Sequence, residues 1–363
     1  MSAVSDWAAT GRTDSFRAVL VDPFTLQELG EVEADWASCS VTYDYEGDTK
    51  AGASVKLADG ADYRIGQRQC MLRVYDDITF ADGASHTACM GTFFCDFSQG
   101  TSLYGREDRE LDCHSCLHRH DKDVLRDDFW RAQGYNVSQA IRELVEADGG
   151  QLTCAPDANT SKCFGTDIWF EAGESKLETA QTMAGWVGCE LMPDSDGRVL
   201  MRRVRTADTH DPAYTFDAGA GCVYKAGIDW GTNRDELVNR VIYVYTEDDQ
   251  TQTAVADLPD WSPWSYANVG YHATRRETMS ELPDGGLQAA AEADLAASST
   301  EQNDISFEAV YVPLVGPGDI VRYVNPNDYT DPVDCLCQVL QMDVSSLTPG
   351  AMTTYKLRIL RWC

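Results

Sequence analysis

A cysteine- and histidine-rich stretch holds the side chains of this sequence that are best suited to bind a metal ion. Cys113 and Cys116 form a C-x-x-C step, and His118 and His120 follow directly after it. Thiolate sulfur and imidazole nitrogen are ligands that zinc prefers. A structural zinc site generally takes two ligand pairs separated by a loop, however, and donors packed this tightly have poor tetrahedral reach. We therefore expect no bound metal here but a polar connection between two folded parts, with a zinc site as the alternative.

An aromatic stretch further along the chain could contact a partner. Trp261, Trp264 and Tyr266 lie close together in a segment that reads as a loop between strands. Exposed tryptophans often mark a protein or sugar contact. The rings could equally fold back onto the strands that flank the loop. The sequence leaves both interpretations open.

The sequence lacks the familiar catalytic motifs. No G-x-S-x-G elbow, H-E-x-x-H helix, phosphate-binding loop or G-x-G-x-x-G turn occurs. Adjacent acidic residues do occur, but a chain this acidic contains them by composition, so they are weak candidates for glycosidase carboxylates. Cys335 and Cys337 are not a redox C-x-x-C pair, and we expect their side chains on opposite faces of a strand. We therefore expect no enzymatic activity and no cofactor.

The strongest feature of the composition is its negative charge. The chain contains 29 lysines and arginines against 59 aspartates and glutamates, which gives a formal net charge of −30. Such a chain repels a phosphate backbone, so we expect no grip on nucleic acid. The charge serves general solubility or, alternatively, forms an acidic wall past which DNA slides without adhering.

The sequence predicts neither export nor membrane insertion. No apolar run approaches the roughly 20 residues of a membrane span, and the start lacks a basic segment followed by an apolar one. The 13 cysteines fall mostly in apolar, strand-like contexts, where a free thiol packs as a small apolar side chain. We expect reduced thiols and synthesis in a cytoplasm.

Strands are the main elements on either side of these candidate residues. Residues 15–99 contain short β-branched or aromatic runs separated by Gly/Asp turns, a spacing typical of an antiparallel barrel or sandwich. Strands return after residue 237, and an alanine-rich segment at 287–298 predicts a helix among them.

The middle of the chain, residues 113–204, reads instead as an α+β insertion. Asn136 predicts the start of one helix, and Ser175 with Glu178 has the capping-box spacing that predicts the start of a second. A hairpin around a turn at residues 193–197 follows the second helix.

Three short motifs and their order resemble a known family. D-x-D-G-R-V-L stands at 194–200, V-N-R-V-I-Y-V at 238–244 and P-L-x-x-P-G-D-x-V at 313–321. In this order, after a β-rich first region and before a final β-hairpin, they are similar to the baseplate hub proteins at the tip of long-tailed bacteriophages. That family includes the amino-terminal hub portion of tail-associated lysins.

The resemblance implies a mainly β fold with two similar β-barrel domains and an inserted α+β domain. The first barrel would comprise residues 1–112 with 205–236, the insertion 113–204, and the second barrel 237–363. Three chains would form a ring whose six quasi-equivalent barrels adapt a sixfold tail tube to a threefold tip. The ring would surround the DNA exit channel without binding the genome specifically.

The resemblance also implies partners and a location. The chain would contact further copies of itself, a distal tail or tail-tube protein, the tape-measure protein, and distal fibre or receptor-binding proteins, at the virion tail tip. It implies no catalytic residues, and because the sequence closes on its last barrel strand we expect any wall-degrading activity on another protein. Three alternatives stay open: a carbohydrate- or receptor-binding β module, a cell-wall hydrolase with an unrecognised carboxylate site, and a contractile-injection relative of the hub.

Overall fold

The chain divides into two compact units, each described here by itself. The first unit comprises Met1–Ile228 with Ser306–Cys363, and the second comprises Asp229–Ile305. The computed structural model describes residues 7, 11–58, 70–103, 106–147, 149–217, 229–233, 238–247, 250–260, 262, 264–279, 286–298, 302–325 and 333–362. None of the helices in these ranges is long and apolar enough to cross a membrane.

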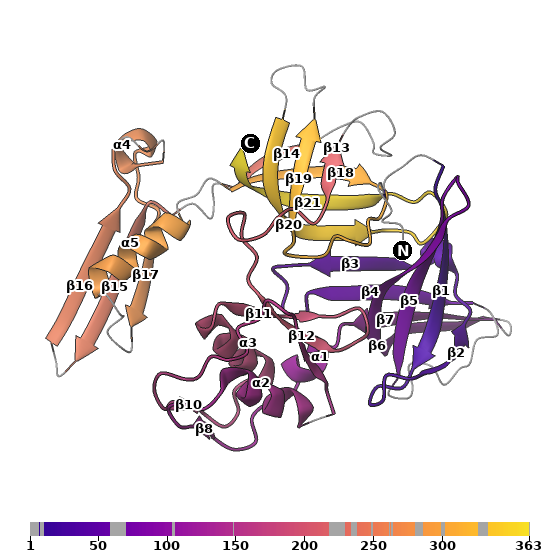
Figure 1. Cartoon of the computed structure of the whole chain (residues 1–363), viewed down its shortest axis with the longest axis horizontal. Coiled ribbons are helices and arrows are strands. Elements are labelled where there is room, and N and C mark those ends of the chain that lie inside the picture. The colour runs from indigo at the N-terminus through magenta and orange to yellow at the C-terminus, as the bar shows by residue number, and fades with distance from the viewer. Residues whose placement is uncertain are drawn as a thin grey trace. The chain divides into compact units, whose positions relative to one another are not determined.

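The N-terminal strands of the first unit form one antiparallel sheet, as the alternating runs of the sequence predict (Figure 1). Their order is β3-β4-β7-β6-β5-β1-β2, with the short helix η1 (Trp36–Ser38) before β3. The strands are β1 (Thr13–Val21), β2 (Glu28–Val32), β3 (Ser40–Asp44), β4 (Ala51–Leu57), β5 (Met71–Thr79), β6 (Ser85–Leu103) and β7 (Arg106–His114). Apolar side chains alternate into the core along β4 and β5, because successive residues of a strand face opposite sides.

The C-terminal strands continue the same sheet. β20 pairs antiparallel with β3 in the register Val344↔Val41 to Gln341↔Asp44, so strands from the two ends of the chain lie side by side (Figure 1). β20 also pairs with β19 and β21, and β13 pairs with β19 in parallel. These strands are β13 (Thr215–Asp217), β18 (Gln302–Ala309), β19 (Ile320–Asn325), β20 (Val333–Val344) and β21 (Thr353–Trp362).

An aromatic cluster forms the core under these C-terminal strands. The Phe307 ring lies 5.1 Å from that of Phe216, 4.9 Å from that of Tyr323 and 5.5 Å from that of Tyr355. The buried hydroxyl of Tyr355 accepts a 2.9 Å hydrogen bond from the amide of Val312 and donates one of 3.1 Å to the carbonyl of Val310. The cluster therefore fixes the start of the loop that carries the P-L-x-x-P-G-D motif.

The predicted α+β insertion is present between β7 and β13. Asn136 and Ser175 cap helices α2 and α3, accepting hydrogen bonds from the amides of Gln139 and Glu178, as their spacing predicts. The small sheets are β10-β8 and β11-β12-β9, and the two helices pack in one core with them. The elements are α1 (Leu117–Asp121), β8 (Phe129–Arg131), α2 (Val137–Glu146), β9 (Leu152–Cys154), β10 (Ile168–Phe170), α3 (Lys176–Trp186), β11 (Cys189–Pro193) and β12 (Val199–Arg203).

The second unit is a small sheet covered by one helix. β15 pairs with β16 antiparallel and with β17 in parallel, and the predicted alanine-rich helix α5 (Leu287–Ser298) buries Ala291 and Leu295 against it. The bounds of these elements are β15 (Arg240–Glu247), β16 (Gln250–Asp257), α4 (Tyr266–Val269) and β17 (Thr274–Met279). β14 (Asp229–Asn233) precedes them in the sequence and is not a strand of this small sheet.

The fold class predicted from sequence is confirmed as mainly β, with a large antiparallel sheet and few helices. The two similar barrels and the domain boundaries at 112, 204 and 236 stay predictions. One local expectation is wrong: the sulfur atoms of Cys335 and Cys337 lie 3.4 Å apart. Residues two apart on a strand share a face, so the two thiols point to the same side of β20.

Candidate functional site

The four residues of the predicted zinc alternative do not converge on one point. Cys113 is buried on β7 with its sulfur 3.7 Å from that of Cys95, on the strand beside it. The thiol of Cys116 donates a 3.1 Å hydrogen bond to the carbonyl of Arg198, and burial raises the pKa of this thiol to about 12. It therefore stays protonated at neutral pH, whereas zinc takes the thiolate. His120 is a buried residue of α1, and of the four residues His118 alone belongs to the group of possible ligands found among the described residues.

That group has a different composition from the predicted one. Within the described ranges, Asp96, His114 and His118 are the His, Cys, Asp or Glu side chains that cluster in a group of three or more possible ligands. His114 follows Cys113 directly, and strand alternation turns it to the opposite face of the sheet.

The aromatic loop of the second unit is partly described. Trp261 lies outside the described residues, whereas Trp264 is half-buried and Tyr266 is exposed. The Tyr266 ring stacks on that of His272 at 4.4 Å. The buried amide of Asn239, in the V-N-R-V-I-Y-V motif, donates to the carbonyls of Trp264 (3.1 Å) and Tyr271 (2.9 Å). Its oxygen accepts from the amide of Ala273 at 2.8 Å, so one side chain closes the loop onto β15.

We expect Asn239→Ala to loosen this loop. The substitution removes a buried side chain that is the partner of two carbonyls and one amide, which costs about 1–3 kcal/mol of the free energy of unfolding. Amide hydrogen exchange should become faster in residues 264–273, and thermal unfolding of the second unit should shift downward. Gln252→Ala, at an exposed position on β16, is the matched control. Equal exchange rates in both variants would contradict the role of Asn239.

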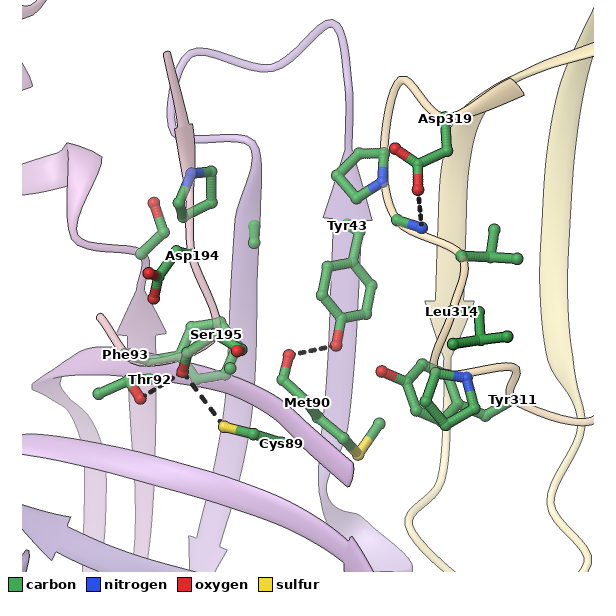
Figure 2. A pocket seen from close by; sticks show the side chains of 18 residues that line it. Tyr43, Cys89, Met90, Thr92, Phe93, Asp194, Ser195, Tyr311, Leu314 and Asp319 are labelled. Atoms are coloured by element: carbon green, nitrogen blue, oxygen red, sulfur yellow. Dashed lines mark hydrogen bonds between the residues drawn. The ribbon is translucent and has the colours of Figure 1, made fainter. Parts of the chain in front are cut away.

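The best-defined cavity of the first unit lies where three parts of that unit meet (Figure 2). Its volume is about 230 Å³, below the roughly 300–1,000 Å³ typical of ligand pockets. The lining comes from β3, the first residue of β4, β6, the residue after β7, the β11–β12 turn and the loop before β19. The lining residues are Tyr43, Ala51, Cys89, Met90, Gly91, Thr92, Phe93, Ser115, Pro193, Asp194, Ser195, Tyr311, Pro313, Leu314, Val315, Gly316, Pro317 and Asp319.

Polar groups of this cavity are engaged in holding its walls together. Figure 2 shows the hydroxyl of Tyr43 donating to the carbonyl of Met90, and the side chains of Thr92 and Cys89 donating to the carbonyl of Ser195 at 2.7 and 3.2 Å. Burial raises the pKa of Cys89 to about 11, so its thiol is a poor nucleophile at neutral pH.

Asp319 is the second carboxylate of the cavity besides Asp194, and it is held by two arginines. Its Oδ1 lies 2.9 Å from Nη1 of Arg202 and 2.6 Å from Nη1 of Arg205, and its Oδ2 accepts the amide of Gly316 at 3.1 Å. Both oxygens of this carboxylate are therefore engaged by donors of the protein itself. The arrangement can hold the loop before β19 in place, but it does not leave this carboxylate free to act on a substrate as a hydrolase would require.

Arg202 is the centre of this lock, and the sequence gives it no motif. It lies on β12 with its side chain 8% exposed; its Nε contacts Glu190 at 2.8 Å and its Nη2 donates to the carbonyl of Pro317 at 2.7 Å. Glu190 in turn accepts a 2.8 Å hydrogen bond from the hydroxyl of Tyr45, just after β3. We call Arg202, Arg205, Glu190, Asp319 and Tyr45 the Arg202 network. It joins the α+β insertion, the N-terminal strands and the C-terminal loop.

The glycine of the P-G-D motif fits against the same network. Gly318 has φ +77°, a conformation that side chains rarely adopt. A Cβ atom there would lie 2.4 Å from the Tyr45 ring and 2.7 Å from Nη2 of Arg202. The motif therefore has a steric reason: the backbone must approach both side chains closely.

The fold of the chain is similar to solved structures of tail proteins. It matches the tail protein from Neisseria meningitidis MC58 with a TM-score of 0.64 and 13% sequence identity, over 95% of this chain and 96% of that one. It matches the 43 kDa tail protein of prophage MuSo2 from Shewanella oneidensis with a TM-score of 0.61 and 13% identity, over 94% and 98%. A chain of the Francisella PdpA–VgrG complex matches with a TM-score of 0.58 and 10% identity, over 98% of this chain and 53% of that one.

Sequence comparison alone does not reveal this likeness. No protein-family model matches the chain, and no curated protein matches it. The similarity suggested by the three motifs is confirmed in three dimensions, and this chain has the fold of phage tail proteins.

Proposed function

We propose that this chain is a structural protein of a phage tail, and specifically the baseplate hub at the tail tip. In this role three copies form a ring around the DNA exit channel. Two similar β-barrel domains in each chain, residues 1–112 with 205–236 and residues 237–363, alternate around the ring. Six quasi-equivalent barrels then meet a sixfold tail tube on one side, while the ring keeps threefold symmetry toward the tip.

The observation that carries the proposal is a match along almost the whole chain to tail proteins of similar extent. At least 94% of this chain and 96% of each tail protein are covered in the two matches above. A single β-barrel occurs in proteins of many unrelated functions, so a match to one barrel would be weak support for a hub function. A long succession of strands, insertion and returning strands in one order is far more specific.

The internal joints of the first unit support a scaffolding role. The β3–β20 pairing and the Arg202 network connect segments more than a hundred residues apart. A ring that transmits force from a tube to a tip needs such rigid joints within each subunit. The cavity between them is small, and Asp319 on its wall is neutralised by arginine.

The acidity of the chain fits passage of DNA through the ring. With a net charge of −30, a ring whose inner surface is net negative repels phosphate, with a reach of about 8 Å at physiological salt. The genome then passes without adhering. A channel lined by lysine and arginine in the assembled ring is the opposite arrangement and is incompatible with this role.

The partners of such a hub are a distal tail or tail-tube protein, the tape-measure protein, and distal fibre or receptor-binding proteins. The exposed ring of Tyr266, stacked on His272, offers a contact surface on the second unit. It supports a second candidate, a carbohydrate- or receptor-binding module of the tail tip, because exposed aromatic rings are common in both kinds of interface.

The mass of the purified chain in solution tests the proposal. Light scattering after size-exclusion chromatography should give three times the 40.1 kDa of one chain for the chain alone. With the tail-tube protein of the same phage, the mass should be that of three chains plus the bound tube protein. Electron microscopy of the peak should show threefold rings. A chain that stays monomeric in both samples and binds glycans supports the second candidate instead. A monomer that degrades peptidoglycan contradicts both.

A further inference from the structure

One polar face of the β6–β7 ladder gathers two histidines and two carboxylates. Asp96 on β6 is the direct cross-strand partner of Asp112 on β7, and His114 lies two positions further on the same face as Asp112. The Nε2 atom of His114 is 4.0 Å from Oδ2 of Asp96 and 4.0 Å from Oδ2 of Asp112. The ring of His118, on α1, stacks on that of His114 at 4.2 Å.

The spacing of these donors is close to that of a metal site. Asp96, His114 and His118 each offer one ligand atom, and the three atoms lie within 4.8 Å of one another. Ligands around a tetrahedral zinc ion sit about 2.1 Å from the metal and hence about 3.4 Å apart. The donors therefore need to close by up to about 1.4 Å, to which rotation of the Asp96 side chain can contribute because it is 69% exposed.

The backbone under the two histidines is held firmly. His114 belongs to β7, which is paired on both sides, with β4 and β6. The turn into α1 is fixed by Ser115, whose hydroxyl donates to the carbonyl of Thr49 and accepts the amide of Leu117 at 3.3 Å. Leu117 is fully buried. The backbone of His118 is thus held close to that of His114. Their rings are stacked with an angle of 15° between the planes, so one ring must rotate before both nitrogens face the same ion.

We propose that Asp96, His114 and His118 bind a divalent transition-metal ion of the zinc class, with Asp112 as the fourth ligand. Two imidazoles with carboxylate oxygen suit zinc, nickel or cobalt, whereas calcium and magnesium take oxygen ligands. The ion would tie α1, the first element of the α+β insertion, to β6 and β7 of the sheet. Its role is structural, and it stands independently of the proposed hub function.

Calorimetric titration of the full chain with zinc, after treatment with EDTA, tests the site. We expect a single tight site whose affinity falls at least about 10-fold in His114→Ala and in His118→Ala, since losing even an outer-shell partner costs about 10- to 100-fold. His210→Ala is the matched control, because His210 forms a simple pair with Asp157 at 3.4 Å. Thermal unfolding in EDTA checks that each variant is folded, and zinc should raise the melting temperature of the wild type and the control only.

The spectrum of the cobalt(II) complex separates this site from the cysteines. Nitrogen and oxygen ligands give weak visible bands, whereas thiolate ligands add an intense near-ultraviolet charge-transfer band. We expect no such band. The proposal is overturned if the wild type binds no zinc, if the two histidine variants bind it as the wild type does, or if the cobalt complex shows the thiolate band.

Discussion

Arg202→Ala should lower the free energy of unfolding of the first unit by about 3–5 kcal/mol, the usual cost of removing one partner from a buried ion pair. Three nitrogen atoms of Arg202 contact Glu190, Asp319 and the carbonyl of Pro317 at 2.7–2.9 Å. The side chains of the two acids are only 14% and 8% exposed. Arg205 still reaches Asp319, so we expect a loss near the lower end of this range.

Urea unfolding followed by tryptophan fluorescence measures this loss. Arg361→Ala is the control, because its pair with Asp208 is 54% and 85% exposed and such pairs contribute about 0–1 kcal/mol. In Arg202→Ala, hydrogen exchange should also become faster in the loop at residues 313–319, which the lost contact to Pro317 frees. A loss no larger than that of the control would show that the network does not lock this loop.

The second large effect is a dependence of stability on pH that Asp76→Asn removes. Asp76 is completely buried on β5; burial, together with the nearby Asp14 carboxylate, raises its pKa to about 7 although Arg12 lies 3.1 Å away. Its Oδ1 finds no hydrogen-bond partner in the described part of the chain. In the unfolded chain an aspartate titrates near 3.9, so the folded state favours the protonated carboxyl.

The direction of the effect follows from this difference. The protonated carboxyl of Asp76 makes its full contribution to the free energy of unfolding below a pH of about 4. This contribution is lost as the pH rises toward and through about 7, and the loss amounts to up to about 4 kcal/mol. The free energy of unfolding of Asp76→Asn minus that of the wild type should therefore rise across this window, because the asparagine stays neutral.

Urea unfolding at several pH values between 4 and 8 gives this difference directly. Asp77→Asn is the control, at the neighbouring half-exposed carboxylate that pairs with Arg17 at 2.9 Å. Its free energy of unfolding should fall with pH as steeply as that of the wild type. A difference that falls with pH would mean that Arg12 outweighs burial, and it would reverse the assignment.

Local signals in the sequence predict the local elements well. The side chains of Asn136 and Ser175 accept from backbone amides three residues on, and that bond depends only on neighbours in sequence. Gly188, with φ +68°, follows the end of α3 for the same kind of reason. The alanine-rich helix has the predicted bounds because twelve consecutive residues carry its propensity.

Long-range pairing and buried charge could not be predicted in this way. The alternation of apolar residues in β3 and β20 predicts which side chains share a face, but neither strand contains a signal that identifies the other as its pairing partner. Arg202 lies at a buried position of β12 and contacts Asp319 across 117 positions of sequence. Arg203 follows it directly and is exposed, so the sequence did not show which of the two arginines is buried or what it contacts.

The metal-ligand prediction grouped residues by proximity in sequence, and strand geometry divides them differently. Leu111 and Cys113 face the core of the sheet, while Asp112 and His114 face outward. Alternation over these four residues was the missed signal. It separates His114 from the cysteines and leaves Asp96 to be supplied by the adjacent strand.

The pairing of β3 with β20 also determines how late in translation the sheet can be completed. Residues 40–44 leave the ribosome roughly 300 residues before their neighbours at 341–344, so the nascent sheet carries an unpaired edge through most of translation. Such edges recruit other chains, and contacts this distant in sequence slow folding. Production at lower temperature or with a holdase chaperone should therefore raise the soluble yield, because the β3 edge stays unpaired until β20 has been made.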